Sequence, residues 1–304
     1  MEKSLLKKNQ IKFRNSIQAR LLVIMFLIVF IPLLGMQVLS TLQSLYSLTS
    51  EVESAFTNSS TSQNRYILDW ADERMQDMKT LAAMPEIQTF DPEKAQGIIE
   101  KYRNDWGIFE SIAMVGKNGI TEINTDQKVI DVRDRAYFVE AITGKDFISE
   151  PVISKGTGNV ILVFATPLVS NGQTVGIIIG NVSFNQIGSI LAEQDLGETG
   201  EAYLINKEGL LVTPLKYEEE LRATGAIEEQ SLLTYKVDTY ASQQILAGNS
   251  GIGRFSNYLG KDVLGSYTWI PDLKIGLIQE QEAGEIFAAT YRNLTYTVIL
   301  FLVV

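Results

Sequence analysis

Residues 148–184 read ISEPVISKGTGNVILVFATPLVSNGQTVGIIIGNVSF and carry the clearest structural pattern of the chain. Three largely apolar runs, residues 148–154, 160–169 and 174–184, are separated by the turn segments GTGN and SNGQ. Short apolar runs bounded by glycine and asparagine predict β-strands. Because connections of so few residues join strands that run in opposite directions, we expect an antiparallel sheet.

The sequence upstream of these strands predicts a hairpin and two helices. Residues 111–115 and 120–124 are short strands on either side of the turn GKNG. Residues 91–105 have helical spacing, and Pro92 stands at the first helical position, where proline is well tolerated. Residues 131–143 (DVRDRAYFVEAIT) predict a short helix with aspartate available as its cap and Gly144 just past its end.

The sequence after about residue 196 repeats this order in a smaller form. Two strands flank the turn KEG, a polar and acidic segment of unclear structure follows, and three further strands come last. The expected strands are residues 201–206, 210–213, 253–258, 261–270 and 274–281. The repeated order indicates two α+β modules in series, the first of them larger.

A long helix is expected ahead of both modules. Residues 41–84 contain no glycine or proline, and apolar or small residues recur at steps of three and four, which is helical spacing. The apolar stripe is weak at Ser59 and Gln63. A helix of about 40 residues is about 60 Å long. We expect one face of it to pack on the modules and to contact a second copy near the membrane.

Two apolar runs lie near the ends of the sequence. Residues 21–39 (LLVIMFLIVFIPLLGMQVL) hold 19 residues without a charge, and a second run starts near Leu294. Since about 20 apolar residues cross a bilayer, we expect one span and the start of a second, truncated one. Six Lys or Arg and one Glu precede the first run, which predicts a cytoplasmic N-terminus. The alternative is a cleaved signal peptide, whose apolar core is shorter, about 7–15 residues.

The composition excludes several classes of function. The formal net charge of −10 argues against binding to nucleic acid or to an anionic lipid surface. The chain has no Cys and no His, so disulfides, Cys/His zinc sites and catalysis by Ser-His-Asp or Cys-His groups are excluded. The acidic residues show no spacing typical of a catalytic pair. We therefore expect a module without catalytic residues, metal or cofactor.

The order of these blocks resembles the double Cache sensor domain, an extracytoplasmic module of bacterial chemoreceptors, sensor histidine kinases and cyclases. The resemblance rests on the apolar span, the long helix, VGKNGITEIN, RDRAYFVEAITG, residues 148–184 and GEAYLINKEGLLVTP, and it covers about residues 40–290. It implies an α+β fold in which a long N-terminal helix carries two PAS-like antiparallel-sheet modules in tandem, bracketed by transmembrane helices.

The resemblance also implies a division of the chain into six segments. They are a cytoplasmic N-terminus (1–20), a transmembrane helix (21–41), a long signalling helix (42–90), a membrane-distal ligand-binding module (91–195), a membrane-proximal module (196–282) and the start of a second transmembrane helix (283–304). Thr213 and Pro214 stand where relatives often carry His-Pro, so we expect the proximal module to transmit the signal and not to bind a ligand.

In this family the distal module binds small ligands between its short helix and its sheet. The amino-acid-binding subgroup carries a Tyr, an Arg, then a Trp and a Tyr after one residue, and an Asp in a later strand. Here the Arg position falls on Arg135, the aromatic pair on Tyr137 and Phe138, and the Asp position on Asn181. The upstream Tyr position falls near Ile130, so the chain departs from the pattern at three positions.

These departures bear on the ligand. The guanidinium of Arg135 matches a carboxylate through two hydrogen bonds. Asn181 keeps an acceptor oxygen but lacks the negative charge that would hold an ammonium group. We therefore expect a carboxylate or a polar uncharged metabolite in preference to a standard α-amino acid. The loop near Ser154 and Lys155 is expected to add a contact.

Without the resemblance, residues 133–135 would be a solvated charge run, and Tyr137 and Phe138 would belong to the core. With it, the expected function is ligand sensing by a homodimeric transmembrane receptor that pairs through its N-terminal and transmembrane helices, in first place a methyl-accepting chemotaxis protein. The alternatives are the input domain of a sensor histidine kinase or nucleotide cyclase, a module that binds a periplasmic or wall protein, and a membrane-tethered enzyme.

Overall fold

The computed structural model describes residues 17–192, 195–227 and 230–303. Most of the expected cytoplasmic segment, residues 1–16, lies outside the described residues. The chain divides into two compact units. One comprises the chain up to Glu51 together with residues from Phe287 on, and the other runs from Val52 to Ile286.

The first unit consists of the early part of helix α1 (Ile17–Ala82) and of helix α9 (Ala288–Val303). The apolar side chains between Leu21 and Leu39 are exposed to a large extent. Among the described helices, only the one ending at Ala82 is long and apolar enough to cross a membrane, by length and composition alone. Helix α9 is apolar but has 16 described residues.

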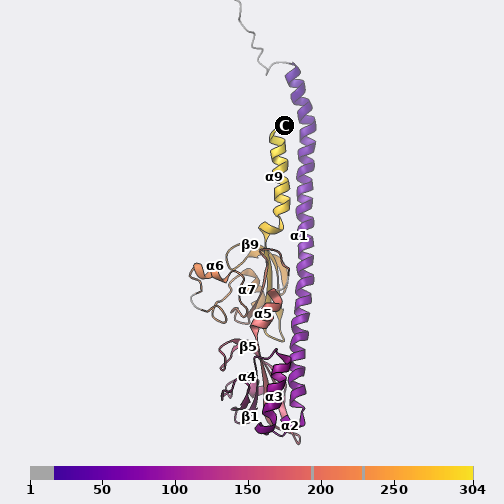
Figure 1. The fold of residues 1–304 in the computed structure, drawn as a ribbon. Coiled ribbons are helices and arrows are strands. Elements are labelled where there is room, and N and C mark those ends of the chain that lie inside the picture. The colour runs from indigo at the N-terminus through magenta and orange to yellow at the C-terminus, as the bar shows by residue number, and fades with distance from the viewer. Residues whose placement is uncertain (1–16, 193–194, 228–229, 304) are drawn as a thin grey trace, which may run out of the picture. The chain divides into compact units, whose positions relative to one another are not determined.

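The second unit begins with the distal module, an antiparallel sheet in the order β2-β1-β6-β5-β3, with β4 also paired to β5 (Figure 1). Its strands are β1 (Ser111–Gly116), β2 (Thr121–Asn124), β3 (Phe147–Ile148), β4 (Val152–Ile153), β5 (Val160–Ser170) and β6 (Gln173–Ser183). Its helices are α2 (Pro85–Gln88), α3 (Pro92–Trp106), α4 (Ala136–Ala141) and α5 (Phe184–Ala192).

The proximal module is a smaller antiparallel sheet in the order β7-β10-β9-β8. Its strands are β7 (Glu201–Asn206), β8 (Gly251–Ser256), β9 (Asp262–Ile270) and β10 (Ile275–Glu282). Its helices are α6 (Glu218–Ala223), α7 (Tyr240–Leu246) and α8 (Ala283–Ile286). The long N-terminal helix α1 and the two antiparallel sheets confirm the predicted α+β fold class.

Three predicted elements differ from the structure. The helix expected over residues 131–143 is reduced to α4, because Asp131 pairs with Ile120 as an isolated bridge and Arg135 caps the helix without a side-chain bond. The strand expected over residues 148–154 is divided into β3 and β4. Pro151 lies between them and has no N–H to donate to the ladder. The return strand at residues 210–213 is limited to two bridges.

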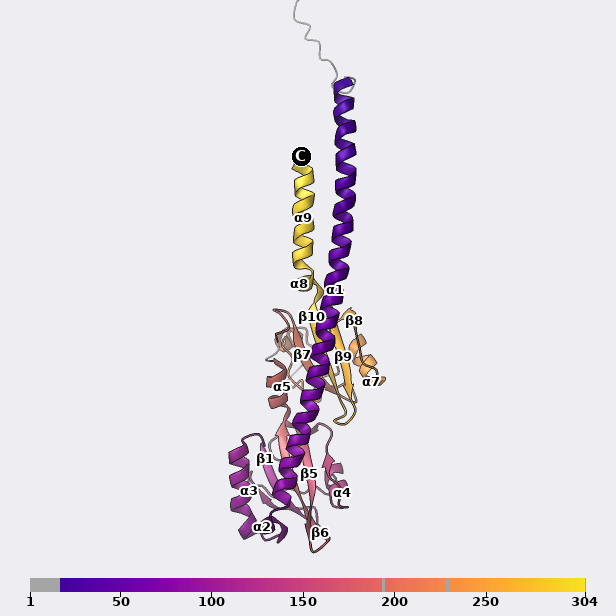
Figure 2. The ribbon, with the colours of Figure 1, turned by 90° about the vertical axis from the view of Figure 1, so that its right-hand side faces the viewer.

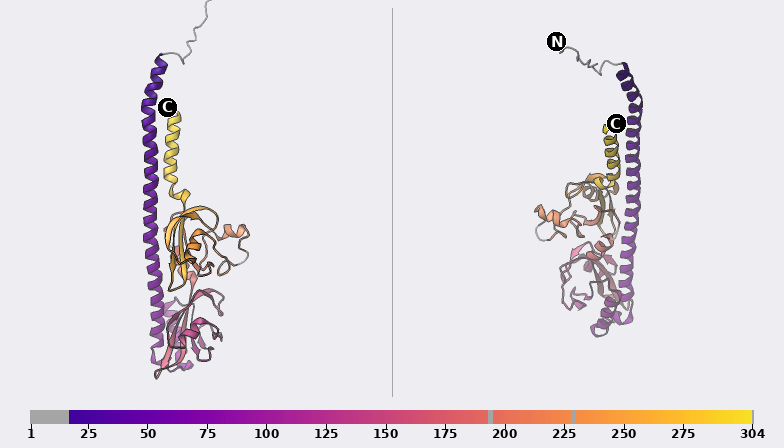
Figure 3. Two further views of the ribbon diagram at one scale, coloured as in Figure 1. Left: turned by 180° about the vertical axis from the view of Figure 1, so that it is seen from behind. Right: turned by 45° about the horizontal axis from the view of Figure 1, so that its top comes forward.

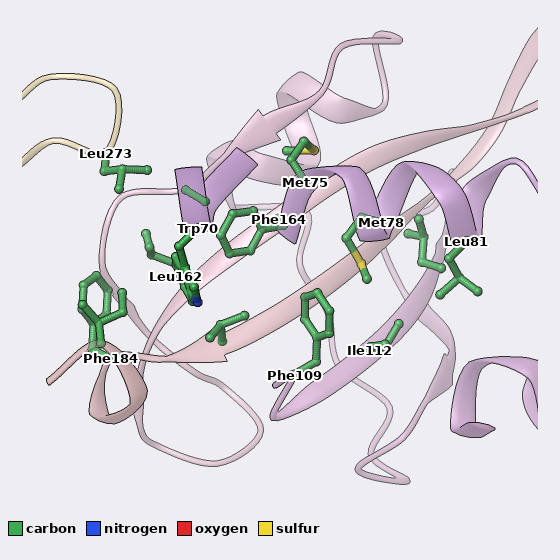
Figure 4. Packing of buried hydrophobic residues seen from close by; sticks show 14 of the residues in the cluster. Trp70, Met75, Met78, Leu81, Phe109, Ile112, Leu162, Phe164, Phe184 and Leu273 are labelled. Carbon is green, nitrogen blue, oxygen red and sulfur yellow. The ribbon is translucent and has the colours of Figure 1, made fainter. Parts of the chain in front are cut away.

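Helix α1 covers one face of the distal sheet (Figures 2 and 4). Trp70 meets the ring of Phe164 edge to face at 5.9 Å, and Met78 and Leu81 are fully buried in the same cluster. The close approach requires a glycine in β6: a Cβ on Gly180 would lie 2.6 Å from the sulfur of Met78. Burying these apolar side chains stabilises the fold through the hydrophobic effect.

The same helix continues along the proximal sheet (Figure 3). It makes polar contacts there: the hydroxyls of Ser60 and Thr268 lie 2.6 Å apart, and Gln279 Nε2 donates to Ser59 Oγ at 2.9 Å. These bonds explain why the apolar stripe of the helix weakens near Ser59. The prediction that α1 packs on its own modules is therefore confirmed for both sheets.

A candidate ligand pocket in the distal module

A hollow opens in the distal module on the sheet face that carries α4, opposite the face covered by α1. It encloses about 380 Å³ of space free of protein atoms, part of it in its open mouth. Buried apolar residues of the sheet form its floor, namely Ala113, Ile161 and Ile179.

The start of α4 carries two of the predicted site residues into this hollow. Arg135 is the N-cap residue with an extended backbone, and its N–H donates to the carbonyl of Val132 at 3.0 Å. Tyr137 follows in the first turn, is 7% exposed and lines the same hollow. Burial raises the pKa of the Tyr137 hydroxyl to about 12, so this group stays protonated and can donate a hydrogen bond.

Two buried polar atoms of lining residues have no partner among the described residues. They are Nε of Arg135 and Oδ1 of Asn181. The guanidinium is held by one other bond, from Nη2 to the carbonyl of Ile153 at 3.3 Å. The Asn181 amide is oriented by Nδ2, which donates to Ser111 Oγ at 2.8 Å. Because buried polar groups are nearly always paired, an unpaired donor and an unpaired acceptor in one hollow indicate a binding site.

Other polar residues of the lining are already paired within the protein. Ser154 Oγ accepts hydrogen bonds from the backbone N–H groups of Gly156 and Thr157, both at 3.2 Å. Thr121 Oγ1 accepts from the N–H of Ile130 at 2.8 Å. The predicted site residue Ser154 therefore lines the hollow, but its hydroxyl is already used to stabilise the turn before β5.

Phe138 is not brought into this hollow. Its ring is 7% exposed and belongs to the buried cluster between α4 and the sheet, together with Val163 and Ile177. Four of the five predicted residues thus lie together in the lining, namely Arg135, Tyr137, Ser154 and Asn181.

Charged side chains near the hollow form ion pairs with one another, but Arg135 is not a member of these pairs. Arg133 binds Asp131 and holds the pKa of that carboxyl at about 2, mainly through side-chain hydrogen bonds. Lys155 Nζ lies 2.7 Å from Asp134 and lowers the pKa of that carboxyl in the same way. Within the described part of the chain, Arg135 forms no ion pair. Arg135 is therefore a basic side chain of the lining that no ion pair neutralises.

Thr121 and Asn124 also line the hollow and were not predicted from the sequence. Thr121 Oγ1 and Asn124 Nδ2 both donate to the carbonyl of Lys128, at 3.3 and 3.0 Å, and so shape the loop that closes one side. Strand alternation would not have found Thr121, because Ile123, two residues on, packs on the α1 face. The pairing of β1 with β2 shifts register between Met114 and Val115, and Val115 is the partner of Thr121.

Comparisons with known proteins identify the family of this chain. The Cache domain family model (dCache_1) matches residues 40–290. The chain is 25% identical over 141 residues to the methyl-accepting chemotaxis protein PctB of Pseudomonas aeruginosa, a match that covers 46% of this chain and 22% of that protein. The chain therefore spans about a fifth of the length of this curated relative.

Two solved structures show the same fold. The sensory domain of the Campylobacter jejuni chemoreceptor Tlp3, with isoleucine bound, superposes with a TM-score of 0.60 at 12% identity, covering 79% of this chain and 96% of that one. The extracellular domain of rpHK1S-Z16, whose name assigns it to the histidine kinases, gives a TM-score of 0.62 at 13% identity, covering 78% and 97%. Such domains sense ligands and are not enzymes. By the match over residues 40–290, this chain belongs to the Cache domain family.

Proposed function

We propose that this chain is the sensing part of a bacterial transmembrane receptor and that its distal module binds a small carboxylate beside α4. In this proposal, residues 91–195 form the ligand-binding module and residues 196–282 form the module next to the membrane. The early part of α1 anchors the chain, the N-terminus is cytoplasmic, and both modules are extracytoplasmic. A second span follows the proximal module.

The observation that carries the proposal is the pair of unpaired buried atoms, Arg135 Nε and Asn181 Oδ1, in one hollow. A carboxylate would accept from the Arg135 guanidinium, which forms strong charge-assisted bonds. A hydroxyl or amino group on the neighbouring carbon of the ligand would donate to Asn181. The Tyr137 hydroxyl would supply a further donor.

The chemistry of Asn181 favours a ligand without an ammonium group. The Tlp3 domain binds isoleucine, so an amino-acid skeleton suits this fold. A neutral amide provides an acceptor but no charge to stabilise an ammonium ion. We therefore propose a hydroxy acid or a similar polar carboxylate as the preferred class, with standard α-amino acids binding more weakly.

Signalling requires that ligand binding favour one of two states of the receptor. In the proposal, the filled hollow changes the packing of the distal sheet on α1, and β10 carries the change toward the second span. The receptor acts as a homodimer that pairs through α1 and the transmembrane helices. Chemotaxis signalling is the proposed output, in line with the partial match to PctB, and a histidine kinase or cyclase output is the alternative.

The test is a binding measurement on the purified chain reconstituted in lipid nanodiscs. We expect L-isoleucine and its 2-hydroxy analogue to raise the melting temperature, the hydroxy acid more strongly. Replacing Arg135→Ala should lower the affinity for the hydroxy acid at least about 30-fold, because a charge-assisted bidentate contact is lost. Isothermal titration calorimetry gives the affinities.

Arg133→Ala is the matched control, because Arg133 is exposed and paired with Asp131. This variant should bind as the unchanged protein does. An unchanged affinity in Arg135→Ala would contradict the site. If a panel of carboxylates, amino acids and neutral metabolites leaves the melting temperature unchanged while a periplasmic protein binds the chain, the small-molecule proposal is wrong.

A further inference from the structure

A second hollow in the distal module shares no lining residue with the first. It lies where the end of α3, the segment leading into β1, the turn before β5 and the start of α5 meet. It encloses about 690 Å³ of space free of protein atoms, including its open mouth. The backbone N–H of Glu110 in this wall donates to the carbonyl of Asn181 at 2.8 Å, so the two hollows adjoin the same strand end.

Two buried acceptor atoms in the lining of this hollow lack a partner among the described residues. They are Oε2 of Glu110 and Oε1 of Gln186. The other carboxylate oxygen of Glu110 is occupied, because Asn159 Nδ2 donates to it at 2.8 Å. An acceptor that is withdrawn from water without a donor costs free energy, and a carboxylate costs the most. The arrangement therefore calls for a donor from outside the chain.

The arginine of this hollow does not neutralise the carboxylate. Arg103 donates through Nε and Nη2 to the backbone carbonyl of Glu110, at 3.4 and 3.2 Å, and through Nη1 to Asn104 Oδ1. In the described part of the chain, Glu110 takes part in no ion pair. The hollow thus presents one carboxylate outside any described ion pair and, in the same lining, a neutral amide oxygen, with Phe109 as an apolar wall.

We propose that this second hollow binds a small organic ammonium ion. A primary ammonium group carries three N–H donors and one positive charge, which matches a carboxylate oxygen and an amide oxygen together. A short carbon chain would lie against Phe109. A divalent metal fits less well, because Ca²⁺ takes six to eight oxygen ligands and no group of three acidic side chains in metal-binding proximity occurs among the described residues. The net charge of −10 also favours the approach of a cation.

Ethanolamine is the probe for this site, tested on the chain in nanodiscs of uncharged lipid. We expect saturable binding by calorimetry and a rise in melting temperature. Ethylene glycol, which replaces the ammonium by a hydroxyl, and choline, which keeps the charge but has no N–H donor, should both bind at least about 10-fold more weakly, because a charged hydrogen-bonded contact is lost.

Two variants locate the binding in the molecule. Glu110→Gln removes the charge at nearly constant volume, and Gln186→Leu removes the second acceptor. We expect losses in ethanolamine affinity of about 10-fold or more and about 3-fold, as for loss of a charged and of a neutral hydrogen bond. Gln186→Leu keeps the test readable if Glu110→Gln fails to fold.

Arg135→Ala is the control, since it removes the first site and should leave ethanolamine binding unchanged. Equal binding of ethanolamine and choline, no saturable ethanolamine binding, or unchanged affinity in both Glu110→Gln and Gln186→Leu would each overturn the proposal. Loss of ethanolamine binding in Arg135→Ala would assign the ammonium to the first hollow and overturn it as well.

Discussion

The distal and proximal modules are both antiparallel sheets, but they differ in how far their buried polar side chains are hydrogen-bonded within the protein. In the distal module, Arg135 and Asn181 keep unpaired atoms in a hollow that opens to solvent. In the proximal module, buried tyrosines and glutamates bind each other: Tyr203 donates to Glu280 Oε2 at 3.2 Å, and Tyr258 donates to Glu201. The first arrangement leaves donors and acceptors for a ligand. The second uses most of them to hold the sheet together, and Glu280 Oε1 is the one carboxylate oxygen of this pair of glutamates that lacks a partner among the described residues.

The proximal cluster also has an electrostatic consequence. Glu201 and Glu280 lie directly opposite each other on β7 and β10 and are 7% and 2% exposed. Burial, and after it the negative charge of Glu201, raise the pKa of Glu280 to about 8. Two like charges at such close range are unfavourable, so the folded protein retains a proton that the unfolded chain would release. The distal module therefore holds a candidate ligand site, whereas the proximal module holds a structural cluster that retains a proton.

The largest effect should come from the packing that supports the distal hollow. Phe164→Ala removes a fully buried ring that contacts Trp70 of α1, and should lower the free energy of unfolding by about 3–5 kcal/mol. Chemical denaturation followed by near-UV circular dichroism measures this. Val169→Ala, at an exposed position of the same strand, should change it by less than about 0.5 kcal/mol. A loss below about 1 kcal/mol in Phe164→Ala would contradict the packing described.

The second effect tests the proximal cluster. The free energy of unfolding should fall as the pH rises from 4.5 toward about 8, because over this range Glu280 keeps its proton only in the folded state. Glu280→Gln cannot release a proton, so it should flatten this dependence and be more stable than the unchanged protein at the alkaline end. Glu219→Gln, at a side chain that is 91% exposed, is the control and should leave the slope unchanged. An unaltered slope in Glu280→Gln would refute the assignment.

A third, smaller effect would make the distal site more like the amino-acid-binding pattern. Asn181→Asp restores a carboxylate opposite Arg135, so the affinity for L-isoleucine should rise by about 10-fold relative to its 2-hydroxy analogue, as an ammonium gains a charged partner. Calorimetry with both compounds measures the ratio. Asn124→Asp places the same charge on a lining residue that already donates to the loop, and it should not change the ratio. An unchanged ratio in Asn181→Asp would show that residue 181 does not face the amino position of the ligand.

The smallest effect concerns the hydroxyl of Tyr137. Tyr137→Phe keeps the buried ring and removes one neutral donor, so affinity for the hydroxy acid should fall by about 2–10-fold while the melting temperature without ligand stays close to that of the unchanged protein. Phe138→Leu is the comparison, because Phe138 packs outside the lining and should affect stability more than affinity. The reverse outcome would exchange the roles of the two aromatic residues.

Several elements could be predicted from the sequence because local signals define them. The long strands expected at residues 160–169 and 174–184 are β5 (Val160–Ser170) and β6 (Gln173–Ser183), since their turns and apolar runs are contiguous in the chain. The helix expected over residues 131–143 was too long. Its first residues are held by distant partners, as in the bond from the N–H of Val132 to the carbonyl of Gly119 at 2.9 Å. Such bonds between separate segments leave no local signal.

The candidate site, like the fold, has features that the sequence determines and features that only the tertiary structure decides. Sequence alone determined the family pattern, the antiparallel order of the main strands and the chemical type of the residues at the site. Arg133 and Arg135 are chemically identical and two positions apart. Arg133 pairs with Asp131, two residues before it, which is a local contact. Only the tertiary structure brings Arg135 into the same hollow as Asn181 of β6 and leaves its Nε buried without a partner among the described residues. The physical reason is that the availability of a polar group depends on which other segments satisfy it, and the fold brings those segments together.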